Sequence, residues 1–198
     1  MARTVGSAAD ETRQRILDVA VDLFIEQGYA GTSVRDISDR LGMTKGSLYY
    51  HFASKEDVLN ALVTPLMDDL DRFTADAASA GSADAALLAR LVDLLDEHGV
   101  LLRSLMGDPS VLHGIARRQT MKQRMLALQR ALAGSDDPDE LLRGRCALGV
   151  INAATIAPRF AMEDGQGPEM CERMVRTRLT DDEKRYVVDA ALAVLHTK

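Results

Sequence analysis

The chain has 198 residues, of which 46% are hydrophobic, so it can bury the core of one substantial domain or two small ones. Aromatic residues make up only 4% and tryptophan is absent, a composition that favours helices over β-sheet. The net charge of −6 argues against a uniformly basic nucleic-acid-binding protein. No uncharged apolar run approaches the roughly 20 residues that cross a bilayer, and residues 1–9 lack the apolar centre of a secretion signal, so we expect a cytoplasmic protein.

The first predicted helix covers residues 10–27. Apolar residues recur along it at helical spacing: Ile16, Ala20, Leu23 and Phe24. We expect Asp10 and Glu11 near the positive end of this helix. Gly28 follows as a C-terminal stop.

Two short helices are predicted next, over residues 34–41 and 45–51. Ser33 and Asp36 match a capping box for the first of them, and Gly42 ends it. Thr44 is a good N-cap for the second. Because only three residues separate the two helices, they cannot be collinear, and the pattern predicts a helix-turn-helix.

A longer helix over residues 54–77 is expected to connect the N-terminal region to the rest of the chain. Pro65 lies within it, and an internal proline removes a backbone hydrogen bond, which predicts a kink or a break there. Residues 78–84 read as a loop. Further helices are predicted over 85–97, 99–106, from 108 to about 134, over 137–156 and from 180 to about 196, with a loop at 163–168. The fold class is therefore all-α, with about nine helices.

Residues 32–55 read TSVRDISDRLGMTKGSLYYHFASK, and they hold four Lys/Arg against two Asp. Over residues 10–60 this segment closely resembles the DNA-binding part of tetracycline-repressor-like (TetR-type) regulators. The resemblance implies a flexible arm at 1–9, a helix-turn-helix domain at 10–56 and a ligand-sensing and dimerisation domain at 57–198. It also implies a sequence-specific regulator, expected to be a repressor, that binds a palindromic operator as a homodimer and is released by an unknown small molecule.

The same resemblance assigns the DNA-binding residues. Base contacts are implied for Arg35, Lys45, Gly46, Ser47 and Tyr49, and phosphate contacts for Thr32, Ser33, Tyr50, His51 and Lys55. Thr44 is also predicted to be a DNA-binding residue, without a particular kind of contact. The physical chemistry agrees, because a glycine lets backbone approach DNA closely, while lysine, serine and tyrosine offer donors for base edges or phosphates.

The C-terminal part shows two weaker patterns. Small residues in the helix before Pro158, together with apolar residues of the last helix, suggest a two-plus-two bundle across a dimer axis, although packing inside one chain explains them equally well. The interface residues predicted on this basis are Ala147, Ile151, Ala154, Val187, Ala191 and Val194. An adaptable apolar pocket with some polar contacts is predicted from Leu102, Arg103, Met106, His113, Arg117, Met121 and Met125.

Enzyme chemistry has little support in the sequence. The four histidines lack metal-ligand spacing, and no phosphate-binding glycine loop or nucleophile elbow is present, so neither a metal nor a cofactor is expected. Cys146 and Cys171 are too few for a disulfide framework, and we expect buried or unreactive thiols. The alternative to a regulator is a helical ligand-binding or interaction protein that does not bind DNA.

Overall fold

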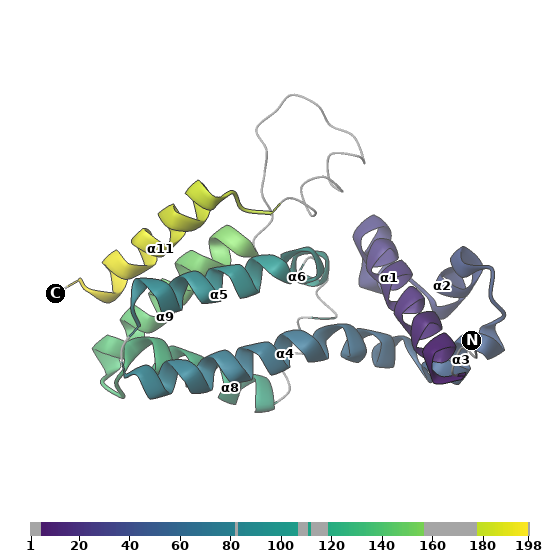
Figure 1. Cartoon of the computed structure of the whole chain (residues 1–198), viewed down its shortest axis with the longest axis horizontal. Coiled ribbons are helices and arrows are strands. Elements are labelled where there is room, and N and C mark those ends of the chain that lie inside the picture. The colour runs from purple at the N-terminus through teal and green to yellow at the C-terminus, as the bar shows by residue number, and fades with distance from the viewer. Residues whose placement is uncertain (1–4, 82, 107–110, 112–118, 157–177, 198) are drawn as a thin grey trace, which may run out of the picture. The chain divides into compact units, whose positions relative to one another are not determined.

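The structure is a computed structural model that describes residues 5–81, 83–106, 111, 119–156 and 178–197. Within these ranges the chain forms nine α-helices and no strand, which confirms the all-α prediction (Figure 1). The chain divides into two compact units, of which the first ends at Pro65 and the second begins at Leu66. No helix among the described residues combines the length and the apolarity needed to cross a bilayer.

The first helix, α1 (Val5–Gly31), is longer than predicted at both ends. The predicted stripe is confirmed as core, since Ile16, Ala20, Leu23 and Phe24 are all buried. Gly28 interrupts the helix with φ of 77°, a conformation that favours glycine. The expected place of Asp10 and Glu11 is wrong: the helix begins at Val5, and its first turn contains no acidic residue.

The next two helices, α2 (Val34–Leu41) and α3 (Lys45–His51), have the predicted bounds. Gly42 adopts φ of 65° at the end of α2, which turns the chain sharply toward α3. Ile37 of α2 and Leu48 of α3 are completely buried, so each helix directs one face into the core of the first unit.

The helix α4 (Lys55–Ala80) contains Pro65 and continues through it, so of the two predicted outcomes, a kink or a break, the break is wrong. Packing explains the difference, because Leu66, Leu70 and Phe73 follow the proline and are buried in the core of the second unit. Burial of each large apolar side chain contributes about 1.5–3 kcal/mol, and three of them together outweigh the roughly 3 kcal/mol that an internal proline costs.

The second unit contains the later part of α4 together with α5 (Ala85–Glu97), α6 (Gly99–Met106), α8 (Gln119–Ala133), α9 (Pro138–Thr155) and α11 (Asp181–Leu195). The helix α11 packs against α9 and α5, and α8 packs against α9 (Figure 1). The predicted helix start at Asp108-Pro109 and the predicted loop at 163–168 lie outside the described residues.

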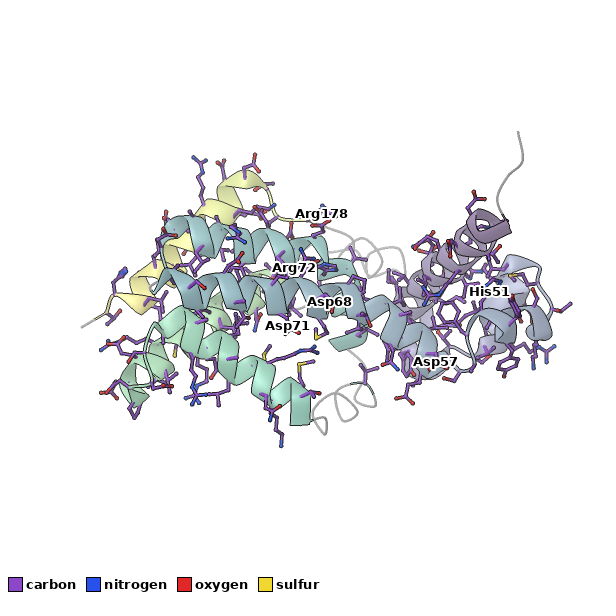
Figure 2. The ribbon with its side chains drawn as sticks, turned by 60° about the horizontal axis from the view of Figure 1, so that its bottom comes forward. His51, Asp57, Asp68, Asp71, Arg72 and Arg178 are labelled. Atoms are coloured by element: carbon purple, nitrogen blue, oxygen red, sulfur yellow. The ribbon has the colours of Figure 1, made fainter. Side chains whose placement is uncertain are left out.

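Polar contacts join these helices at their edges. Arg124 of α8 forms a two-pronged ion pair with Asp71 of α4, which Figure 2 labels. Asp96 at the end of α5 is buried, and its carboxylate accepts a hydrogen bond of 3.1 Å from the backbone N–H of Leu179. A hydrogen bond to Asp93 raises the pKa of Lys184, which also lies 3.6 Å from Asp96. These charges hold the start of α11 against α5.

Candidate nucleic-acid interface

The helix-turn-helix is held by caps at both of its helices. The Ser33 hydroxyl accepts a hydrogen bond from the Asp36 backbone N–H at 3.2 Å, and the Asp36 carboxylate accepts one from the Ser33 backbone N–H at 2.7 Å. The predicted capping box is therefore confirmed. Thr44 caps α3 by accepting a hydrogen bond of 3.2 Å from the Ser47 backbone N–H. Local side chains thus define where both helices begin.

One face of α3 is buried and the other is open. Leu48 and the following residue Phe52 are in the core, whereas Tyr49 and Tyr50 are 50% and 84% exposed. The exposed residues at the start of the helix are Thr44, Lys45, Gly46 and Ser47. The exposed tyrosines combine apolar rings with hydroxyl donors, and polar donors lie beside them. Such a surface can contact the bases and phosphates of DNA.

The backbone at Gly46 is exposed to solvent, and there is room for a side chain at this position. A Cβ added at this position would meet only the Thr44 hydroxyl, at 4.0 Å. The fold of the free protein therefore does not require a glycine here. The missing side chain also leaves the backbone at the start of α3 open to close approach by another molecule.

Arg35 lies on the exposed side of α2 and forms a weak ion pair with Asp39 at 3.3 Å. A surface pair of this kind is worth at most about 1 kcal/mol, so the guanidinium can exchange Asp39 for another partner. His51 ends α3 and is half-buried, and its ring meets the Tyr50 ring edge-on with centroids 5.2 Å apart.

The structure is at odds with the expected phosphate contact by Thr32. Its side chain is only 2% exposed, and its hydroxyl donates a hydrogen bond of 2.8 Å to the Gly28 carbonyl. Thr32 therefore closes the end of α1 and is not accessible to DNA. Ser33 is exposed, but its hydroxyl donates to Asp36 at 2.7 Å, so a phosphate contact there would compete with the capping box.

Lys55 also differs from the expectation. Its ammonium donates to the carbonyl oxygens of Tyr29 at 2.6 Å and Thr32 at 2.7 Å, and it lies 4.1 Å from the centre of the Tyr29 ring. A phosphate contact was expected for Lys55, whereas in this structure two of the three ammonium protons are used inside the unit. Sequence spacing carries no signal for these contacts, which join residues 23 and 26 positions apart.

The predicted pocket residues do not form one described cavity. Arg103 is buried and donates to the Thr155 carbonyl at the end of α9, and Leu102 belongs to the core. Met121 and Met125 are half-buried on α8. The side chain of Met106, and all of His113 and Arg117, lie outside the described residues.

Two grooves are formed by other residues of the second unit. The larger, of about 820 Å³, lies between α4 and α8 and is lined largely by small side chains, with the Asp71–Arg124 ion pair on its wall. The smaller, of about 560 Å³, lies between α4 and α5 and includes Phe73 and Arg90. Of the predicted pocket residues whose side chains the structure describes, Leu102, Arg103, Met121 and Met125, none lines either groove.

Most of the predicted dimer-interface residues are buried within one chain. Ala147 and Ile151 of α9, and Val187 and Ala191 of α11, belong to the core of the second unit, and Ala154 and Val194 pack against it. The four core residues cannot contact a partner, so their assignment is wrong. The physical reason is that α9 and α11 use these faces to pack against each other and against α5.

The opposite faces of the same helices are exposed. On α9 the outward residues repeat at intervals of three or four positions, and most are small or apolar: Leu142, Cys146, Gly149 and Ala153. On α11, Tyr186 is 76% exposed and Ala193 is also exposed. Of the two alternatives expected for the cysteines, a buried or an unreactive thiol, Cys146 is not the buried one, because it is exposed; Cys171 lies outside the described residues. Gly149 and Ala153 of this stripe belong to the small-residue pattern that the sequence shows before Pro158, but the six predicted interface residues do not include the exposed positions.

An all-helical chain with a capped helix-turn-helix and an exposed polar recognition face belongs to the class of helix-turn-helix regulators. The family model described as bacterial regulatory proteins, tetR family, matches residues 16–62. The HTH-type transcriptional regulator SrpR of Pseudomonas putida is 37% identical over 92 residues, which are 46% of this chain and 43% of SrpR. The chain therefore matches less than half the length of that relative.

A second relative is matched over more of its length. The uncharacterized HTH-type transcriptional regulator TtgW, also of Pseudomonas putida, is 37% identical over 92 residues, which are 46% of this chain and 69% of TtgW. The fold is shared with a transcriptional regulator from Aquifex aeolicus VF5, at a TM-score of 0.59 and 19% identity over 83% of this chain and 95% of that one. The chain belongs to the tetR family of bacterial regulatory proteins.

Proposed function

We propose that this protein is a sequence-specific DNA-binding regulator, acting as a repressor in the cytoplasm, that reads its operator with α3. The observation that carries the proposal is the open face of this helix. Lys45, Ser47 and Tyr49 are exposed there, while Leu48 on the opposite face is completely buried. A helix anchored in this way presents a rigid set of donors that fits a major groove.

The net charge of −6 bears on how such a protein binds DNA. Its non-specific affinity should be modest, because phosphate contacts supply most of the affinity for random DNA and only a local surface is basic. Direct base contacts then have to supply the discrimination, at about 1–3 kcal/mol for each good contact. We therefore expect a high ratio of specific to random binding at physiological salt.

The test is a selection of bound duplexes from random DNA, followed by titration of the selected duplex and of a scrambled duplex with the same composition. Lys45→Ala and Tyr49→Ala should weaken binding to the selected duplex by about 1–3 kcal/mol each and reduce the discrimination between the two duplexes. Lys122→Ala, which removes a lysine from an exposed position of α8 in the second unit, is the matched control and should bind as the wild type does. Selection of no sequence by the wild-type protein would favour the alternative, a helical ligand-binding protein without DNA-binding activity.

The active species is proposed to be a homodimer. A single seven-residue helix contacts too few base pairs for useful specificity, whereas two copies about 34–36 Å apart would read a palindrome. The exposed stripe of Leu142, Cys146, Gly149 and Ala153 supports a dimer surface on α9, and Tyr186 extends it onto α11. Small outward side chains allow two helices to approach closely.

We propose that a small molecule releases the protein from DNA. The resemblance to TetR-type regulators supports this proposal, and so does a groove in the second unit. The groove between α4 and α8 is open and lined by alanines, with Asp71 and Arg124 on its wall. A compound seated there would compete with their ion pair and so change the contact between the two helices. Titration of candidate compounds against the preformed protein–DNA complex, with Arg124→Ala as a variant, tests this location.

A further inference from the structure

Lys55 links three helical elements of the first unit through a single charged group. It occupies the first position of α4, and its ammonium reaches the carbonyl oxygens of Tyr29 in the last turn of α1 and of Thr32 just after it. The same ammonium lies over the Tyr29 ring, 4.1 Å from its centre. Tyr29 in turn packs edge-on against the buried Phe24 of α1, with ring centres 5.2 Å apart.

The segment that Lys55 holds is the one that sets the start of α2. Gly28 changes the backbone direction there, and the Thr32 hydroxyl bonds back to the Gly28 carbonyl. The Thr32 backbone N–H donates to Tyr29 at 3.3 Å, and the N-cap of α2, Ser33, follows directly. A shift of the Tyr29–Thr32 backbone would therefore move the first turn of α2.

A shift of α2 would be passed on to the recognition helix. Only three residues separate α2 from α3, and the backbone N–H of Met43 is bonded to the Ser38 carbonyl of α2 at 2.9 Å. Ile37 and Leu48 are both completely buried, so the two helices cannot slide past each other without disturbing the core. The orientation of α3 thus depends on the turn that Lys55 holds.

We propose that Lys55 is a positioning residue for DNA recognition, which acts by holding the Tyr29–Thr32 turn and thereby the orientation of α2 and α3, and not by binding a phosphate. This inference rests on the proposed DNA-binding function. The ammonium has three protons, and two are used in short charge-assisted bonds, which are about twice as strong as bonds between neutral groups. To bind a phosphate in place of these carbonyls, Lys55 would have to release the turn.

The two roles predict different salt dependence. A lysine that neutralises a phosphate releases a counterion, so its removal lowers the slope of log K against log salt by about 0.9 and weakens specific and random DNA alike. A lysine that acts only through protein carbonyls contributes nothing to that slope. Its removal instead misplaces α3, which lowers the affinity for the correct sequence more than the affinity for random DNA.

The experiment compares Lys55→Met with Lys45→Met, which removes a charge of the same kind from the exposed start of α3. Each protein is titrated, across a series of salt concentrations, with a duplex selected by the wild-type protein and with a scrambled duplex of equal length. Lys55→Met should bind the selected duplex about tenfold or more weakly at an unchanged salt slope, with little change on the scrambled duplex. Lys45→Met removes a cation from the proposed DNA surface itself, so it should lower the slope on the selected duplex.

A slope reduced by about one in Lys55→Met, with equal losses on both duplexes, would overturn the proposal, and so would unchanged binding to both. Failure of the wild type to select any duplex would instead overturn the proposed function. Thermal unfolding must first show that Lys55→Met is folded at the assay temperature. If it is not, Tyr29→Leu removes the ring beneath the ammonium without removing a charge, and it should also lower discrimination at an unchanged slope; unaltered discrimination in this variant counts against the proposal.

Discussion

Gly144 of α9 lies directly against the backbone oxygen of Gln129 on α8, which would be only 2.7 Å from a Cβ at residue 144. Gly149, five residues further along α9, has nothing within 4 Å of the same position. The first glycine allows α8 and α9 to pack closely, whereas the second faces outward. The two glycines thus mark the inner and outer faces of one helix.

Replacing Gly144 by alanine should destabilise the second unit by about 1–3 kcal/mol, because the added methyl group forces α8 away from α9. The better helix propensity of alanine, worth up to about 1 kcal/mol, offsets only part of this. Gly149→Ala is the matched control and should be neutral or stabilising. Urea unfolding followed by circular dichroism measures both, and equal midpoints for the two variants would contradict the assigned packing.

Gly46→Ala should separate folding from DNA binding. The structure leaves room for a methyl group at this position, and alanine favours helix, so the melting temperature should stay the same or rise. If DNA approaches the start of α3 as proposed, that methyl group will collide with it and weaken the complex by about tenfold or more. Undiminished affinity for the selected duplex would show that the backbone at Gly46 does not closely approach DNA.

Asp36 should make the first unit less stable in acid. The Ser33 hydroxyl, followed by the Ser33 backbone N–H, holds the pKa of Asp36 below its ordinary value of 3.8. Because the carboxylate has a lower pKa in the folded state, its stabilisation is complete above the ordinary value and is lost as the pH falls through the lower one.

Melting temperatures of the wild type and of Asp36→Asn, measured from about pH 7 to pH 2, test this prediction. The asparagine variant should be the less stable protein at neutral pH, and the difference should shrink below the ordinary pKa of 3.8. A difference that stays constant over the whole range would mean that the charge of Asp36 does not contribute to the cap.

The outward stripe of α9 predicts which substitutions separate dimer formation from folding. Ala153→Glu places a charge on the exposed stripe, so it should yield a folded monomer if this surface is the dimer contact. Ala147→Glu buries a charge in the core of one chain and should prevent folding of the second unit. Sedimentation together with circular dichroism distinguishes the two outcomes. A folded dimer in Ala153→Glu would place the interface elsewhere.

The sequence by itself determined the helix-turn-helix, because its boundaries depend on local chemistry. Ser33 caps α2 through residues three positions away, Gly42 ends it by adopting a positive φ, and Thr44 caps α3 in the same local manner. Such interactions are set by neighbours along the chain, so both helices have their predicted bounds. The exposed face of α3 follows from the same short-range periodicity, with Leu48 turned inward.

Only the tertiary structure decided which residues are free to meet a partner. Thr32 is closed off by the end of α1, Lys55 is bonded to carbonyls more than 20 residues away, and Ala147 faces α11 instead of a second chain. The passage of α4 through Pro65 likewise depends on the core that Leu66 enters. These outcomes depend on contacts between segments distant in sequence, whose burial energies exceed local propensities and leave no periodic signal in the chain.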